Sequence, residues 1–161
     1  MWVPRLTLIS VACAIGMYAF SAPIHALADD AVLPNVNAFQ PVKPSDYSVM
    51  EGAWYAFATP EGLTCVLDRR NGGYGCSGAI PAAPRGANIV SAGPTGPPDF
   101  ASGDRPLYGD IGQPVKALPT NSRLSVGTIS CGTDGVATSC VNTRDQTGFV
   151  ISPAGSFVIR R

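Results

Sequence analysis

The sequence predicts a small all-β domain, an antiparallel sandwich or open barrel held by disulfides, with long Pro/Gly-rich loops and a signal helix before it. Stretch 124–150 places two cysteines around Asp134-Gly135, between arms rich in Val, Ile, Thr and Ser, which is typical of a β-hairpin. Stretch 62–77 repeats this plan around Asn71-Gly72. The 18 Gly and 15 Pro among 161 residues favour strands, turns and loops over helices.

The N-terminus has the three-part layout of a secretory signal. Arg5 supplies a positive charge, residues 6–20 are apolar, and Ala26-Leu27-Ala28 offers small residues to a signal peptidase. We therefore expect residues 1–28 to be a signal peptide that is cleaved after Ala28. An uncleaved membrane anchor is the alternative, but the apolar run is shorter than the roughly 20 residues that a spanning helix needs.

The rest of the chain divides into an arm and one β domain. Residues 29–52 hold three prolines and no clear periodicity, which predicts an extended N-terminal arm or linker, with an edge strand over 36–39 as the alternative. The β domain then covers residues 53–161. Besides the hairpin arms, we expect strands over 53–58, 147–151 and 156–160, and two short strands, 87–91 and 113–118, in the proline-rich segment 78–121.

The core is expected at strand positions beside the cysteines, where alternate side chains share one face. The predicted core residues are Leu63, Leu67, Val126, Ile129, Phe149, Ile151, Phe157 and Ile159. The loops of the proline-rich segment are expected to pack through Phe100, Leu107 and Tyr108.

Four cysteines follow the signal: Cys65, Cys76, Cys131 and Cys140. In an exported chain of this size, they are expected to form disulfides. Of the three possible connectivities, we favour Cys65–Cys76 and Cys131–Cys140, because each pair can face across a four-residue hairpin loop. A rival connectivity would cross between the hairpins. Neither pair has the spacing of a zinc knuckle, so we expect no metal and no cofactor.

Several function classes have little support in the residues. Signal cleavage would remove His25, the only histidine, so the mature chain would have no Ser-His-Asp triad and no Cys-His dyad. The formal net charge is 0, or −1 once Arg5 has left, and there is no basic stripe. We therefore expect neither nucleic acid nor, after cleavage, a membrane surface as a partner.

The strongest enzymatic alternative is a hydrolase of envelope glycans, in which two carboxylates meet across a cleft. Aspartates in turns and loops more often cap backbone amides, and no motif indicates which two would meet. The aspartates concerned are Asp68, Asp104, Asp110, Asp134 and Asp145.

One wider pattern links the two halves of the chain. It consists of Thr59-Pro60-x-Gly62-x-x-Cys65, Cys76, Leu118-Pro119, Gly127-x-x-x-Cys131, Cys140-Val-Asn142 and Gly148-Phe149-x-x-Ser152. Over residues 55–160 it resembles a group of small exported proteins of mycobacteria and related actinobacteria, which have no assigned activity. The chain departs from them in its long segment 78–117. The resemblance implies an exported, disulfide-bonded β domain of the cell envelope or medium, and it brings no catalytic residue.

We therefore expect a non-enzymatic binding module that is secreted or held at the cell envelope, with an envelope or extracellular protein or glycan as its partner. Tyr and Arg dominate binding hot spots, and a hairpin tip beside a disulfide would lose little entropy on binding. A structural envelope protein without a discrete ligand is a further alternative. The candidate binding residues are Arg69, Arg70, Trp54 and Tyr74, with Tyr55 and Tyr108 as further surface aromatics.

Overall fold

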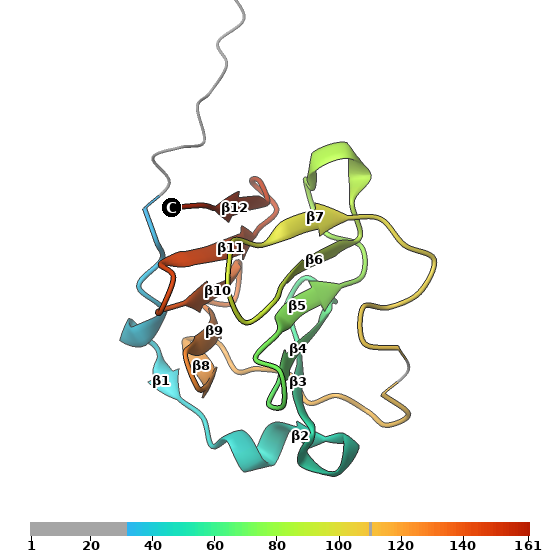
Figure 1. Ribbon diagram of the computed structural model, residues 1–161, viewed down its shortest axis with the longest axis vertical. Coiled ribbons are helices and arrows are strands. Elements are labelled where there is room, and N and C mark those ends of the chain that lie inside the picture. Colours follow the sequence, from blue (N-terminus) through green and yellow to red (C-terminus); the bar gives the residue numbers. More distant parts are fainter. Residues whose placement is uncertain (1–31, 110) are drawn as a thin grey trace, which may run out of the picture.

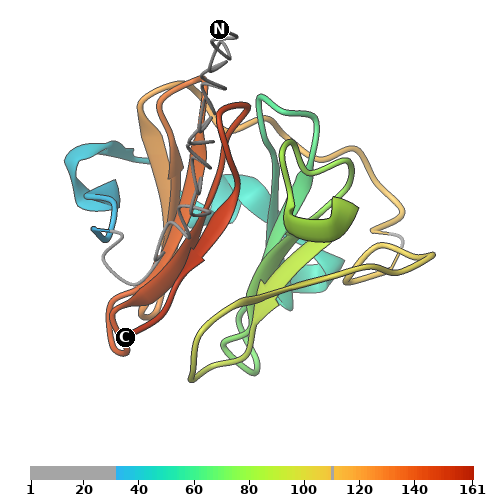
Figure 2. The ribbon, with the colours of Figure 1, turned by 90° about the horizontal axis from the view of Figure 1, so that it is seen from above.

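The computed structural model describes residues 32–109 and 111–161 and consists of two six-stranded sheets. Figure 2 shows the sheets face to face, with the orange-red sheet opposite the green-yellow one. The sheets do not join into a closed barrel, so the prediction of an all-β, disulfide-stapled domain is confirmed in its sandwich form. The predicted signal peptide, with Cys13 and His25, lies outside the described residues, and its cleavage stays a prediction.

Each sheet is an antiparallel meander of five consecutive strands with one short strand added at its edge (Figure 1). The first sheet has the order β2 (Ser48–Val49), β3 (Trp54–Ala58), β4 (Thr64–Asp68), β5 (Tyr74–Ser77), β6 (Ile89–Ala92) and β7 (Asp99–Ala101). The second has the order β1 (Gln40–Pro41), β8 (Ser122–Val126), β9 (Ile129–Thr133), β10 (Thr138–Asn142), β11 (Thr147–Ile151) and β12 (Phe157–Ile159).

The N-terminal arm contributes to both sheets, which differs from the expected separate arm or linker over 29–52. Strand β1 pairs in parallel with β8, and β2 pairs antiparallel with β3. The alternative strand over 36–39 is instead the 3₁₀ turn η2 (Val36–Ala38). Val36, Tyr47 and Val49 are buried, so apolar contacts fix the arm on the domain.

Both predicted disulfides are present. Cys65–Cys76 joins β4 to β5, and Cys131–Cys140 joins β9 to β10. In each hairpin the two cysteines are direct cross-strand partners, and the four-residue loops 69–72 and 134–137 connect the arms as predicted. All four cysteines are fully buried between the sheets. Each bond therefore joins the second and third strands of its meander, which gives the two halves of the chain a similar plan.

The core between the sheets contains most of the predicted core residues. Val126 is half-buried, and the prediction for Phe157 is wrong, because this side chain is 37% exposed. The register pairs Val158 with Phe149, and Val158 packs on the core, so its neighbour Phe157 points to the other face. The predicted residues that lie in this core and are at most 3% exposed are Leu63, Leu67, Ile129, Phe149 and Ile151. Ile159 is also buried, but it lies on the same face of β12 as Phe157, away from the core between the sheets.

The proline-rich segment crosses the outer face of the first sheet, on the right of Figure 2. Strand β6 matches the predicted strand at 87–91, but no strand forms at 113–118, where only Ala117 bridges to Ala58. Pro114 lacks the amide that a ladder needs. Residues 103–109 and 111–115 form instead a covering segment that we call the strap. Its Ile111 and Val115 pack on a second apolar cluster, which is formed by Val49, Ala56 and Val66.

Candidate binding site

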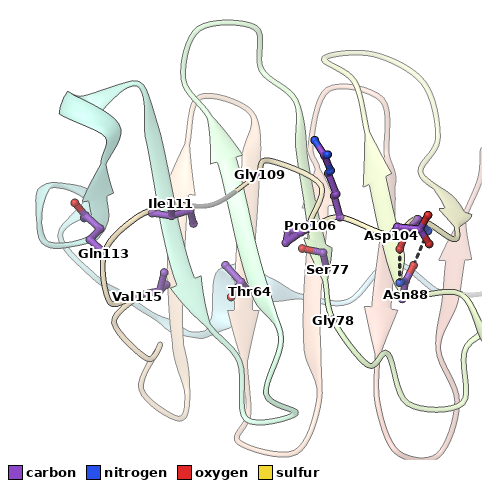
Figure 3. A pocket seen from close by; sticks show the side chains of 12 residues that line it. Thr64, Ser77, Gly78, Asn88, Asp104, Pro106, Gly109, Ile111, Gln113 and Val115 are labelled. Carbon is purple, nitrogen blue, oxygen red and sulfur yellow. Dashed lines mark hydrogen bonds between the residues drawn. The ribbon is translucent and has the colours of Figure 1, made fainter.

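The strap and the outer face of the first sheet enclose a cleft of about 490 Å³ (Figure 3). Its floor is formed by Thr64 on β4, Ser77 on β5 and Asn88 just before β6. These strands are neighbours in the sheet, and adjacent strands lie about 4.8 Å apart. The cleft therefore extends roughly 10 Å across the strands, which gives it an elongated floor.

Three contacts hold the strap in place. The Asn88 side chain donates from Nδ2 to the Gly103 carbonyl at 2.8 Å and accepts from the Gly103 amide at 3.0 Å, as the dashed lines in Figure 3 show. Leu107 packs over Gly75, where an added Cβ would lie only 2.7 Å from the Leu107 Cδ2 atom. Trp54 and Tyr108 meet edge to face with ring centroids 5.3 Å apart. Because side chains already fix the strap, the cleft is formed before any ligand arrives.

The lining of this cleft combines hydrogen-bonding and small apolar groups. The hydroxyls of Thr64 and Ser77 and the amide of Gln113 supply both donors and acceptors. Ile111 and Val115 add an apolar wall on the strap side. This composition suits a ligand with many hydrogen-bonding groups and some apolar surface.

Charged side chains are few in the cleft. Asp104 and Arg105 lie next to each other where the strap begins, and both are exposed. Asp104 is the one carboxylate among the described lining residues. Asp110 follows Gly109 in the sequence but lies outside the described residues.

The strap cleft and three further cavities do not have, among their described lining residues, the pair of carboxylates that a two-carboxylate hydrolase needs. Each of these four cavities is lined by one carboxylate among the residues that the structure describes. Inverting and retaining glycosidases both use a pair of acids around the scissile bond. The four carboxylates belong to Asp104, Asp68, Glu61 and Glu51.

Three of the loop aspartates cap backbone amides, as turns favour. Asp68 accepts from the amide of Arg70 at 2.8 Å, and Asp145 accepts from the amide of Gly96 at 2.8 Å. Asp134 accepts from the two amides that follow it in its loop, each at 2.8 Å, and these hydrogen bonds hold its pKa below the ordinary value. These carboxylates stabilise loops.

The predicted binding residues of the hairpin tip are divided between two further cavities. Arg69 lines a cavity of about 460 Å³ that opens toward the second sheet. Arg70 and Trp54 line a separate cavity of about 400 Å³ beside Met50. Both arginines are exposed and Trp54 is half-buried. The structure therefore brings Arg70 and Trp54 together but directs Arg69 to another site.

The prediction that Tyr74 lies on the binding surface is wrong. Its side chain is fully buried and stacks on Phe149, with ring centroids 5.9 Å apart. Tyr74 and Cys76 are two positions apart on β5, so both face the core. Burial raises the pKa of Tyr74 to about 12. Tyr55 is half-buried against the same core. Tyr108 belongs to the strap and is half-buried where its ring meets that of Trp54.

The residues on the cleft floor were missed from the sequence. Thr64, Ser77 and Asn88 are common polar residues without a motif. The sequence did contain one indication that another segment approaches here. Gly75 lies within a strand, where a glycine often marks the close approach of another part of the chain. That segment is the strap, through Leu107.

No cluster of His, Cys, Asp and Glu that could hold a metal ion occurs among residues 32–109 and 111–161. Within the same residues, no helix has the length and apolar character needed to cross a membrane. No family model, no curated protein and no solved structure matches this chain. The chemistry of its cavities is therefore the guide to its function.

Proposed function

We propose that this protein is a non-enzymatic binding domain that acts outside the cytoplasm and holds an elongated polar ligand in the strap cleft. The observation that carries the proposal is the cleft itself. Its volume of about 490 Å³ lies within the range of small-ligand sites, roughly 300–1,000 Å³. Its walls are fixed by Asn88, Leu107 and Trp54, so a ligand would meet a surface that is already formed.

The shape and lining of the cleft support a glycan or an extended peptide as the ligand. A floor of roughly 10 Å accommodates about three residues of extended peptide at 3.3 Å per residue. The hydroxyls of Thr64 and Ser77 and the amide of Gln113 can exchange hydrogen bonds with sugar hydroxyls or with peptide groups. Both ligand types occur at the cell envelope and in the medium, where we place the protein.

The extracytoplasmic setting has a physical basis in the two buried disulfides. Such bonds persist in oxidising compartments outside the cytoplasm. The finer assignment, to secretion or to the cell envelope, is part of the proposal. It is supported by the signal-like N-terminus and by the resemblance to exported actinobacterial proteins.

The first test asks whether the purified protein binds or reacts. Glycan and peptide arrays are expected to give saturable binding to a related set of ligands. Glycan, ester and peptide substrates should be left intact. Binding to no member of either array would contradict the proposal.

The control for activity is Asp104→Asn, which removes the one described carboxylate of the cleft and keeps its size. Turnover that survives purification and is lost in Asp104→Asn would identify a hydrolase and overturn the binding proposal. If turnover persists in Asp104→Asn, the companion variant Asp110→Asn tests the carboxylate that the structure does not describe.

A further inference from the structure

A second cavity of about 460 Å³ lies at the end of the sandwich where the two sheets meet; we call it the sheet-end cavity. Arg69 reaches it from the loop between β4 and β5, and Arg144 reaches it from the turn between β10 and β11. Pro94 and Gly127 belong to two further loops in its wall. The cavity shares no lining residue with the strap cleft, so it stands apart from the proposed function.

Both arginines of this cavity are exposed, and neither forms a salt bridge with a described residue. The salt bridge found among the described residues joins Arg160 to Asp99. No carboxylate in the described part of the chain lies within salt-bridge distance of Arg69 or Arg144. The sheet-end cavity therefore presents two guanidinium groups whose donors are free for a ligand.

The acidic residues beside these arginines accept hydrogen bonds from amides, and one of them, Asp68, also lines the cavity. Asp68 is 8% exposed, and its Oδ1 accepts from the amides of Arg70 at 2.8 Å and Asn71 at 3.4 Å. Asp145 Oδ2 accepts from the Gly96 amide at 2.8 Å and from the Asn142 Nδ2 at 3.4 Å. These oxygens are occupied by amide donors, whereas the guanidinium groups of Arg69 and Arg144 remain available as donors on the cavity wall.

The walls of the cavity are fixed by contacts between the two sheets. The fully buried Asn142 donates to the Pro94 carbonyl at 3.3 Å, and the Thr147 hydroxyl donates to the Gly96 carbonyl at 3.3 Å. These bonds tie the β6–β7 loop of the first sheet to β10 and β11 of the second. The arginine loops have bonds of their own, because Asp68 Oδ1 accepts from the Arg70 amide at 2.8 Å and Asn142 Oδ1 accepts from the Arg144 amide at 3.1 Å. Both loops therefore need little ordering of their backbone when a ligand binds.

We propose that the sheet-end cavity binds a phosphoryl group. The planar fork of arginine matches phosphate and carboxylate oxygens in bidentate pairs. A carboxylate has two oxygens in one plane and is matched by one fork, whereas a phosphoryl group has three terminal oxygens and can engage two arginines at once. Gly127 is exposed and leaves its backbone accessible beside the cavity. The group can belong to free phosphate, to a small phosphoester or to a lipid headgroup.

The test is a titration of the ¹⁵N-labelled protein, followed by amide chemical shifts. The probes are inorganic phosphate, glycerol 3-phosphate and phosphatidylglycerol vesicles, with sodium chloride at matched ionic strength as the reference. We expect saturable shifts in the amides of residues 69–73 and 126–129. Arg69→Ala and Arg144→Ala should each weaken binding at least about tenfold, because each removes charge-assisted hydrogen bonds.

The matched control is Arg70→Ala, which removes the neighbouring exposed arginine that lines a different cavity. Arg70→Ala should leave the affinity for the phosphate probes unchanged. Binding of vesicles alone, if lost in Arg69→Ala, would assign the phosphoryl group to a lipid headgroup. Shifts that do not saturate, shifts that sodium chloride reproduces, or an equal loss in Arg70→Ala would overturn the proposal.

Discussion

At the scale of single residues, Phe149 and Phe157 form a matched pair for testing the core. Phe149 is fully buried and stacks on Tyr74, whereas Phe157 is 37% exposed on the edge strand β12. Phe149→Ala should therefore lower the free energy of unfolding by about 3–5 kcal/mol. Phe157→Ala should lower it by less than about 1 kcal/mol. Urea unfolding curves of the two variants measure both values, and equal losses would contradict the assigned faces of β11 and β12.

Tyr74 gives the domain a predictable response to alkaline pH. Burial raises the pKa of Tyr74 to about 12, and the charge of Asp145 acts in the same direction. Burial also raises the pKa of Tyr108 to about 12. Because the unfolded phenols titrate near 10, the folded state holds more protons between pH 10 and 12. Its stability, fully present below pH 10, should fall as pH rises through this window.

The matching variant is Tyr74→Phe, which keeps the ring and removes the titrating hydroxyl. Urea unfolding at intervals from pH 9 to 12 should show a smaller loss of stability for Tyr74→Phe than for the wild type. Tyr108 still titrates, so part of the loss should persist. Identical pH dependence in the two proteins would show that Tyr74 does not contribute.

The face of a strand on which a side chain lies was predictable from the sequence wherever a nearby cysteine indicated which face points to the core. The alternation from Cys65 places Leu63 and Leu67 in the core, and the structure confirms both. The same alternation from Cys76 would have placed Tyr74 inside, but its position near a hairpin tip suggested a surface role. The prediction for Phe157 was wrong for a different reason. Which side chains of β12 face the core depends on the register in which β12 pairs with β11, and this register directs Val158 to the core.

At the scale of elements, the strap is the feature on which the proposed function depends. Asn88 holds its first residues through two hydrogen bonds to Gly103. Asn88→Ala should loosen the strap and expose Tyr108, so chymotrypsin should cleave after Tyr108 several-fold faster. Mass spectrometry of the fragments over time measures this rate.

A matched control for the strap is Asn37→Ala, since Asn37 is exposed in η2 on the other sheet's side of the molecule. It should leave the cleavage rate after Tyr108 unchanged. Equal rates in wild type and Asn88→Ala would show that other contacts, such as Leu107 on Gly75, suffice to hold the strap.

The hairpins were predictable because their signals are local. Each pair of cysteines and its four-residue loop specify both register and disulfide within fewer than twenty residues. The strap was not predictable in the same way. Its contacts join Tyr108 to Trp54 and Ile111 to the apolar cluster on the first sheet, positions far apart in the sequence. Its prolines and glycines follow no strand or helix period.

At the scale of the whole molecule, the two sheets have a similar strand plan, but different segments of the chain cover their outer faces. A buried disulfide joins the second and third strands in each, and the N-terminal arm adds an edge strand to each. On the outer face of the second sheet, Val36 and Phe39 approach Gly132 closely. On the outer face of the first sheet, the strap leaves the cleft open. This difference places the proposed binding site on one sheet.

The most direct measurement compares the affinity of Ser77→Trp and Ser139→Trp for the ligands that the arrays identify. Each serine is half-buried beside a disulfide cysteine, Ser77 after Cys76 on β5 and Ser139 before Cys140 on β10. Ser77 lines the strap cleft, whereas Ser139 lies on the second sheet. If the ligand occupies the strap cleft, Ser77→Trp fills its floor and weakens binding at least about tenfold, an amount of roughly 1.4 kcal/mol, while Ser139→Trp binds as the wild type does. Unchanged affinity in a folded Ser77→Trp, or an equal loss in both variants, would contradict a ligand site beneath the strap.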